Sequence, residues 1–435
     1  MGVLTSILLG TALLLTAVTA PVLLWEGVLG IRGLLPRRRR DEPAESAEPP
    51  VFHRFAAVVC ARNEEAVIGA LLDSLRAQDY PADRLDLFVA ADNCTDDTAG
   101  EAARHGARVY ERFNREQVGK GYALRWLLEK IQEERPDAYD VVAVFDADNL
   151  VTPDFVRRMN EAFCAGADLV KGSRHASNPA DSWVSGAYAI YWRGLMHFFH
   201  RAHALWGLSC FVDGTGFAFK TELIRDGGWN THSLVEDCEF SMQQICRGKT
   251  ILPLDDAVYY DEQPPSFGVS VRQRYRWTVG CIQCIKYCFS DAWRAFRRGK
   301  GEGGPSRFQA LDVLCFLLLI PAVALSFVAS CCGVLYFLLS IPSPLAGAAI
   351  LLAVLAAFWL VLSCVAVAIR LLDRQPLRPV AGAILLFPVF MLSMNVIGLA
   401  ALVHPKTAWK PIAHRGKKEE AKKEEARSDS ALPMR

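Results

Sequence analysis

Residues 141–148 read VVAVFDAD, and this stretch decides the fold class. The apolar run 141–145 predicts a strand that is buried on both faces, as in parallel sheets covered by helices on each side. Asp146 and Asp148 follow directly, so two carboxylates stand where this strand ends. Carboxylate oxygens suit Mg2+ or Mn2+, and these ions also bind phosphate oxygens. The stretch therefore predicts a cation site at a strand end, with an ordinary acidic loop as the alternative.

Short apolar runs alternate with helical patterns on both sides of this stretch. Strands are expected at 55–60, 85–90 and 108–110, and helices at 64–76, 98–105, 122–133 and 153–165. Strands that alternate with helices pair in parallel through right-handed crossovers. Ligands of such sheets bind beyond the carboxyl ends of the strands. The polar residues at the strand ends are therefore the candidates for chemistry.

Polar residues follow the first two expected strands at these ends. Residues 61–64 come after the first strand, and Asp92 comes after the second, where it is the candidate for contact with a base or ribose. Both exits also contain good helix caps, which is the structural alternative to binding. Lys120 stands between two glycines and can meet a phosphate as a point charge. The spacing around it lacks a full P-loop, which argues against an ATPase.

A second acidic region lies further along the chain. Residues 213–216 read DGTG, and Glu236 and Asp237 follow at the start of a predicted helix. A sugar hydroxyl is a poor nucleophile until a base removes its proton, and a carboxylate within hydrogen-bond reach can do this. Asp237 is the preferred candidate for that base. The alternative is an acidic first turn that complements the helix dipole.

Residues 272–277 read RQRYRW and combine three arginines with a glutamine and an indole. An arginine can neutralise a departing diphosphate. Gln273 offers both a donor and an acceptor to sugar hydroxyls, and Trp277 offers a flat face for a sugar ring. A basic amphipathic helix on an anionic membrane surface is the alternative, and the two roles are compatible.

Hydrophobic residues make up 52% of the 435 residues, and the excess gathers at the two ends of the chain. Residues 3–24, 313–339, 345–369 and 380–403 are long enough to cross a bilayer. Arginines at 37–40 follow the first run, so a cleaved signal peptide is not expected. The positive-inside rule then places the N-terminus outside the cytoplasm. The following part is then cytoplasmic. An odd number of later spans conflicts with the basic tail, which prefers the inside, so the alternative to four spans is that one run lies in the interface or is re-entrant. The net charge of +1 gives no pull toward nucleic acid.

Cysteine, histidine and aromatic residues gather without a clear ligand pattern. Thirteen scattered cysteines do not predict a disulfide scaffold and favour a reducing compartment. The spacing of Cys281 and Cys284 lacks a second pair, so packing is expected rather than zinc binding. Histidines at 197, 200 and 203 drift around a helix and are not expected to bind a metal. Aromatic residues crowd 183–206 and predict an acceptor path, core packing or membrane contact.

Taken in order, these segments resemble family 2 glycosyltransferases, and among them the membrane synthases of cellulose, chitin, hyaluronan and poly-N-acetylglucosamine. The matching run extends from about residue 55 to 277. Three departures stand out. Val235 precedes the acidic pair where the family often has threonine, residues 93–94 are Asn-Cys where many members have Gly-Ser, and one N-terminal span makes processive synthesis doubtful.

The resemblance implies an α/β catalytic domain of the GT-A type, a UDP-sugar donor and Mg2+ or Mn2+ as the cofactor. It implies inversion at the sugar, with Asp237 as the base and Asp146 and Asp148 as metal ligands. By the same resemblance, the nucleotide-sugar is bound by Ala61, Arg62, Glu64, Asp92, Lys120, Asp146, Ala147, Asp148 and Arg276, and the acceptor by Gly214, Thr215, Gly216, Glu236, Gln273 and Trp277.

The resulting hypothesis is a multi-pass protein of the cell membrane that transfers a hexosyl or N-acetylhexosaminyl group to a growing polysaccharide at the cytoplasmic face, with or without translocation. The first alternative is a non-processive enzyme that glycosylates a lipid, either a glycolipid precursor or a polyprenyl phosphate. The second is a non-catalytic transporter or receptor with a degenerate transferase domain. The expected domains are a membrane helix (1–36), a linker (37–52), the GT-A domain (53–307), a membrane region (308–405) and a charged tail (406–435).

Overall fold

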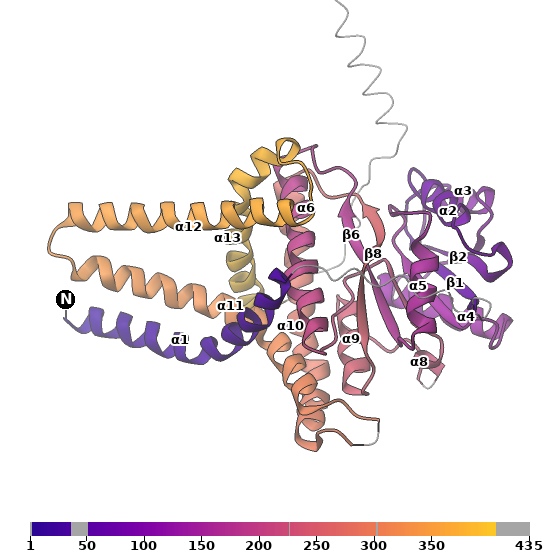
Figure 1. Cartoon of the computed structure of the whole chain (residues 1–435), viewed down its shortest axis with the longest axis horizontal. Coiled ribbons are helices and arrows are strands. Elements are labelled where there is room, and N and C mark those ends of the chain that lie inside the picture. Colours follow the sequence, from indigo (N-terminus) through magenta and orange to yellow (C-terminus); the bar gives the residue numbers. More distant parts are fainter. Residues whose placement is uncertain (1, 36–50, 226, 302, 406–435) are drawn as a thin grey trace, which may run out of the picture.

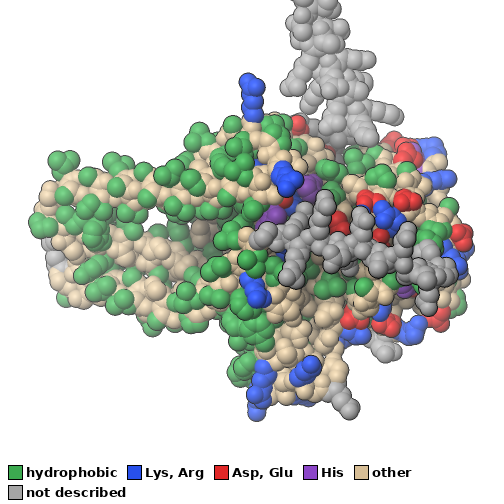
Figure 2. All heavy atoms as spheres, viewed as in Figure 1, with side chains coloured by type: hydrophobic (Ala, Val, Ile, Leu, Met, Phe, Trp, Pro, Cys, Tyr) green, Lys and Arg blue, Asp and Glu red, His purple; other side chains and the backbone are tan. Residues whose placement is uncertain are grey.

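The computed structural model describes residues 2–35, 51–225, 227–301 and 303–405, so the arginines at 37–40, most of the expected linker and the charged tail lie outside the described residues. Figure 1 shows two parts, a twisted sheet flanked by helices and a set of long helices that extends away from it. Hydrophobic side chains cover the extended helices, whereas acidic and basic side chains gather over the sheet domain (Figure 2).

The first four long strands are parallel neighbours, as the sequence predicts. β1 (Phe55–Ala61) pairs with β2 (Leu85–Asp92) and β4 (Val141–Phe145), and β2 pairs with β3 (Arg108–Arg112). Each apolar run forms a strand because both of its faces are covered. One face packs on α2 (Ile68–Arg76) and α5 (Phe155–Cys164), and the other on α4 (Lys120–Glu134) and α9 (Glu236–Cys246).

The second half of the sheet, for which the sequence analysis predicts no strands, is mixed. The full order is β3-β2-β1-β4-β7-β6-β8-β5. β7 (Phe217–Lys220) runs antiparallel to both β4 and β6 (Leu169–Ala176), while β8 (Ile251–Asp261) is parallel to β6 and antiparallel to β5 (Leu150–Val151). Because β7 is reversed, the loop that precedes it lies at the edge where β4 ends.

One helix boundary differs from the sequence expectation. The helix expected from residue 64 begins at Ile68, because the preceding residues form a turn that is tied to the neighbouring strand exit. In that turn the backbone N–H of Glu64 donates to Thr98 Oγ1 at 2.9 Å, and the Asp97 N–H donates to Glu65. The remaining short elements are α3 (Thr98–Arg104), α7 (Ala202–Leu205), α8 (Glu222–Arg225) and a π-helical segment at Met196–Arg201.

Two helices form a platform between the sheet and the long apolar helices. α6 (Trp183–Leu195) begins with a capping box at Ser182, and α10 (Phe267–Arg298) carries the RQRYRW stretch. The amphipathic pattern of α10 follows from its place, because one face covers the sheet domain while Tyr287, Phe289 and Trp293 remain exposed. Both helices run roughly across the direction of the long apolar helices in Figure 1.

Four helices are long and apolar enough to cross a membrane. α1 (Gly2–Ile31), α11 (Arg307–Ser340) and α12 (Pro344–Leu372) extend away from the sheet in Figure 1. α13 (Ala381–Val403) instead runs across the base of the other three, beside the platform. Length and hydropathy alone do not distinguish these two placements.

Buried contacts attach α13 to the platform. Arg274 of α10 is 1% exposed and donates to the Phe390 carbonyl at 3.1 Å, with its guanidinium 4.1 Å from the Phe390 ring centroid. A Cβ at Gly186 of α6 would lie 2.7 Å from the Ala383 Cβ, so only glycine permits this approach. Asp373, just after α12, accepts from Arg193 of α6 at 2.6 and 2.8 Å.

The close approach of α6 and α13 predicts an asymmetric response to a bulky residue. Gly186→Val should destabilise the protein by about 1–3 kcal/mol through overpacking, and should lower the midpoint of thermal unfolding in detergent. Gly382→Val is the matched control, because a Cβ at Gly382 meets no atom within 4 Å. Equal midpoints for the two variants would contradict the described packing of α13.

Candidate active site

A cavity of about 640 Å³ opens at the edge of the sheet where the parallel strands end. Its lining joins both acidic regions found in the sequence with the α10 stretch. Of the predicted site residues, those that line it are Ala61, Arg62, Glu64, Asp92, Lys120, Asp146, Ala147, Asp148, Gly214, Glu236, Asp237, Gln273, Arg276 and Trp277. Thr215 and Gly216 are not part of the lining. Convergence on one cavity meets the geometric condition for a shared site, and the individual roles remain predictions.

Asp146 and Asp148 lie in the turn after β4, and the loop before β7 supports this turn. The Asp146 N–H donates to Thr215 Oγ1 at 2.8 Å, and the Asn149 side chain contacts both Thr215 and Asp148. Thr215 is therefore a buried support beneath the acidic pair, and its predicted acceptor role stays a prediction. Gly216 is required for a different reason: at its φ of 63°, a Cβ would lie 2.2 Å from the Tyr259 ring.

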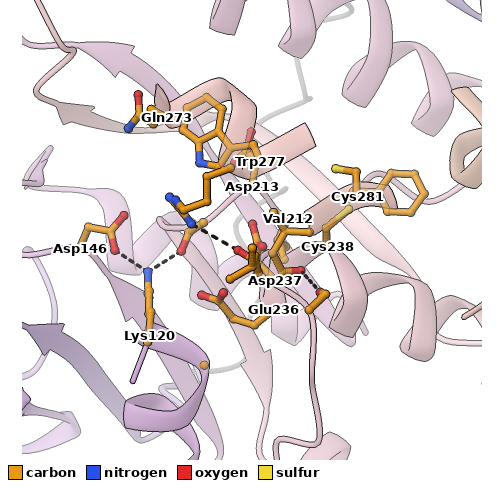
Figure 3. A pocket seen from close by; sticks show the side chains of 18 of the residues that line it. Lys120, Asp146, Val212, Asp213, Glu236, Asp237, Cys238, Gln273, Trp277 and Cys281 are labelled. Carbon is orange, nitrogen blue, oxygen red and sulfur yellow. Dashed lines mark hydrogen bonds and ion pairs between the residues drawn. The ribbon is translucent and has the colours of Figure 1, made fainter. Parts of the chain in front are cut away.

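Lys120, at the start of α4, joins the two halves of the site. Its ammonium group pairs with Asp146 and donates to the Gly214 carbonyl at 2.6 Å (Figure 3). Burial lowers the pKa of this lysine, but the carboxylates of Asp146 and Glu236 outweigh burial and raise its pKa above the ordinary value. Lys120 is thus a fixed positive charge beside the acidic pair.

The exits of β1 and β2 are cross-linked and conformationally special. Asn63 and Asn93 have φ values of 59° and 54°, in the left-handed region that asparagine tolerates. Asn63 accepts from the Thr95 N–H at 2.8 Å. Asp92 is held by Arg112, which donates to its Oδ1 at 2.6 Å while both side chains are buried. Sequence reasoning missed Arg112, although it ends the neighbouring strand β3.

Asp237 and Glu236 occupy the first turn of α9, as predicted. Burial raises the pKa of Asp237 above its ordinary value. Burial, and then the adjacent Asp237 carboxylate, raises the pKa of Glu236 to about 7. Figure 3 shows this pair between Lys120 on one side and Cys281 on the other. A carboxylate with a raised proton affinity is well suited to accept a proton from an alcohol.

A buried network behind the base was missed from the sequence. Lys171 and Arg174, in β6, pair with Asp213: Lys171 Nζ lies 2.9 Å from the Asp213 carboxylate, and Arg174 donates to the Asp213 carbonyl at 2.6 Å. Burial would raise the pKa of Asp213, but the two cations outweigh burial and hold it well below its usual range. The available signal was two basic residues in an otherwise apolar strand, LVKGSRHA.

The predicted α10 residues face the same cavity from the membrane side. Gln273 accepts from the Tyr188 hydroxyl at 3.2 Å, and Arg276 donates to the Leu234 carbonyl at 3.3 Å. Trp277 packs against Trp192 with ring centroids 5.7 Å apart. Arg274, which lies between Gln273 and Arg276 in the sequence, instead points away from the cavity and donates to the Phe390 carbonyl of α13.

The charge balance of the cavity favours a bound cation. Nine carboxylates line it against four Lys or Arg side chains, counted over the lining residues that the structure describes. Asp261, at the end of β8, was missed from the sequence. Burial raises its pKa to about 7, and Asp148 and Asp146 add to the rise while Arg174 opposes it. Mg2+ and Mn2+ use one or two protein carboxylates plus substrate phosphates, which this oxygen-rich donor set fits.

The cysteines and histidines lie in different surroundings, and the expectation that they bind no metal stays a prediction. Cys284 is buried in the core beside Cys238, in support of packing. The three histidines contact different carboxylates: His197 lies 2.8 Å from Asp373, His200 lies 3.5 Å from Asp213, and His203 lies 3.3 Å from Asp312. The last pair and Glu26 bring three potential ligand atoms within 4.8 Å at the base of α1 and α11, outside the cavity.

Part of the sequence is similar to curated glycosyltransferases. β-Monoglucosyldiacylglycerol synthase of Synechocystis sp. is 28% identical over 254 residues, covering 56% of this chain and 50% of that protein. Glucomannan 4-β-mannosyltransferase 7 of Arabidopsis thaliana is 26% identical over 240 residues, covering 52% and 42%. The chain thus spans about half the length of these curated relatives.

The structure of the mannosyltransferase PcManGT from Pyrobaculum calidifontis, in complex with GDP-Man and Mn2+, aligns with a TM-score of 0.58 and 21% identity over 90% of this chain and 99% of that one. This likeness confirms the GT-A type of fold. Residues 53–280 match the profile of the family described as "Glycosyltransferase like family 2". This segment is more than half of the chain, and the chain therefore belongs to glycosyltransferase family 2.

Proposed function

We propose that the chain is a membrane-bound, inverting glycosyltransferase that transfers a hexosyl or N-acetylhexosaminyl group from a UDP-sugar to a hydroxyl acceptor. The observation that carries the proposal is the single cavity that gathers the acidic pair, Lys120, Asp237 and Arg276. These carboxylates and cations are intact, which argues against a degenerate, non-catalytic domain. The family membership and the fold rest on the comparisons and would stand even if this proposal were wrong.

The donor would lie along the exits of β1, β2 and β4. Arg112 and Asn93 both donate to Asp92 Oδ1, which leaves Oδ2 as an acceptor for the imide N–H of uracil. A divalent cation held by Asp146 and Asp148, with Asp261 beside them, would neutralise the diphosphate. Lys120 and Arg276 supply further positive charge, so the leaving group departs more easily.

The acceptor hydroxyl would be activated by Asp237. The carboxylate takes the proton while the hydroxyl oxygen bonds to the anomeric carbon from the face opposite the diphosphate. The bond from that carbon to the diphosphate oxygen breaks, UDP leaves with the electron pair, and the configuration inverts. Asp213 stays ionised through Lys171 and Arg174, and its loop fixes the floor of the cavity next to the base.

We infer that α1, α11 and α12 cross the membrane and that α13 lies at its cytoplasmic face. The crosswise direction of α13 and its buried contacts with α6 and α10 support this (Figure 1). Basic residues at 294–300 precede α11, and others at 370–378 follow α12, as the positive-inside rule requires of cytoplasmic flanks. Three crossings also put the basic tail on the cytoplasmic side.

Asp237→Asn should abolish transfer and leave nucleotide binding nearly intact. Loss of a general base costs about 10²–10⁴-fold in rate, whereas the amide keeps the shape of the side chain. Radiolabelled sugar transfer and calorimetric titration with UDP and Mn2+ measure the two properties. Asp291→Asn is the control, since Asp291 is exposed on α10 and outside the cavity. Near-normal turnover of Asp237→Asn would reject the base assignment.

Asp148→Ala should weaken Mn2+-dependent binding of UDP by about tenfold or more, because even indirect supports of metal ligands cost 10–100-fold. Titration of UDP with Mn2+ and with EDTA isolates the metal-dependent part. Asp154→Ala, at the N-terminus of α5 and outside the cavity, serves as the comparison. An unchanged manganese dependence in Asp148→Ala would exclude the metal role.

The topology predicts opposite results for two alkaline phosphatase fusions, since this reporter is active only outside the cytoplasm. A fusion after residue 343, between α11 and α12, should be active, and a fusion at the C-terminus should be inactive. A green fluorescent protein fusion at the C-terminus should be bright. An active phosphatase at the C-terminus would mean that α13 crosses the membrane.

A further inference from the structure

The cavity continues past the base toward the membrane. Beyond Asp237 and Cys281 its wall becomes apolar and is built by the end of α6, the π-helical segment after it, the loop before β7 and residues 316–320 of α11. The residues of this apolar end are Tyr191, Trp192, Leu195, Phe199, Phe211, Phe316, Leu317, Leu319 and Ile320. A membrane helix therefore forms one side of the same cavity that holds the carboxylates.

Three packed aromatic rings lie where the lining of the cavity changes from charged to apolar residues. Phe211 and Phe316 stack with centroids 3.9 Å apart and an interplanar angle of 17°. Phe199 lies 5.8 Å from Phe211 and 5.5 Å from Phe316. Asp312 stands one turn before Phe316, and Ile320 one turn after it. At 1.5 Å per residue, the apolar wall on α11 begins about 6 Å beyond the last carboxylate of that helix.

The described residues at the apolar end of the cavity include no positively charged side chain that lacks a partner. Among the described residues that line it, His200 is the one titratable base, and burial, followed by Lys171, lowers its pKa to about 4, so it is neutral at neutral pH. Lys171 and Arg174 lie nearby but are committed to Asp213, Tyr259 and Asp261. The apolar end therefore suits an uncharged part of the acceptor, because a charged group buried there without a partner is costly.

We infer that the acceptor is an uncharged lipid alcohol of the membrane, whose chains lie along Phe316 and Ile320 while its hydroxyl reaches Asp237. This inference rests on the proposed function and names its acceptor class. A growing polysaccharide would need hydrogen-bonding partners along its length, and the apolar end supplies almost none. A polyprenyl phosphate would react through its phosphate, whose charge would lie beside Glu236 and Asp237 in a cavity where nine carboxylates face four Lys or Arg side chains.

Full-length protein in phosphatidylcholine vesicles separates the two proposals. UDP release from a panel of UDP-sugars, measured with each candidate acceptor in turn, reports the transferase function. Dioleoylglycerol should then raise the rate at least about tenfold and give a labelled product that partitions into chloroform. Undecaprenyl phosphate and cello-oligosaccharides should not. UDP release with a water-soluble or polymeric product would overturn the lipid acceptor and leave the transferase standing, whereas no UDP release from any donor would overturn both.

Chain length tests the apolar wall in the unmodified protein. Dibutyrylglycerol carries the same hydroxyl as dioleoylglycerol but little apolar surface, so its kcat/KM should be at least about tenfold lower. Equal values would mean that only the head is recognised, and the inferred tail site would be wrong.

A matched pair on α11 tests the same wall. Ile320→Trp should narrow the apolar end and raise the KM for dioleoylglycerol about tenfold or more. Leu318→Trp places the same ring on the exposed side of the same turn, where Leu318 is 37% exposed, and should leave the KM unchanged. UDP affinity serves as the folding control for both. Equal KM values in two folded variants would overturn the inference.

Discussion

The structure depends on the burial of mutually repelling carboxylates at one edge of a sheet. Asp146, Asp148, Asp213, Glu236, Asp237 and Asp261 come from different elements and line one cavity. Buried charges are tolerated only when they are paired. Lys120 pairs with the β4 end, and Lys171 with Arg174 stabilises Asp213. Glu236, Asp237 and Asp261 receive less compensation, and their raised pKa values express that deficit.

The reversal of β7 makes this crowding possible. A parallel strand would begin at the opposite edge, and its preceding loop would lie far from the acidic pair. Because β7 is antiparallel to β4 and β6, the DGTG loop reaches the edge where β4 ends. Thr215 then supports Asp146, and Gly214 receives Lys120. The segment that the resemblance assigns to the acceptor thus supports Lys120 and the acidic pair through hydrogen bonds, and its contact with an acceptor stays a prediction.

The sequence predicted the parts of the molecule whose signal is local. The four parallel strands, their helices and the acidic pair each follow from a run of apolar residues and its polar end. Arg112, Lys171, Arg174 and Asp261 were missed because their partners lie on other strands or, for Lys171, in the loop before β7, and pairing between distant segments leaves no periodic trace. The mixed half of the sheet was missed for the same reason, since β7 pairs with β4 and β6, and β8 with β5 and β6, across long stretches of sequence.

The placement of α13 shows why hydropathy alone gave a contradiction. A helix that packs between a platform and a bilayer is apolar all round, and so is a helix that crosses. Counting α13 as a span leaves the basic tail on the wrong side. Two contacts distinguish α13 from the other long apolar helices: Arg274 of α10 donates to a carbonyl of α13, and Gly186 of α6 permits its close approach. No pattern in the sequence links Arg274 to α13, because the two lie more than 100 residues apart. The same stretch therefore lines the cavity with Gln273, Arg276 and Trp277 and attaches α13 through Arg274.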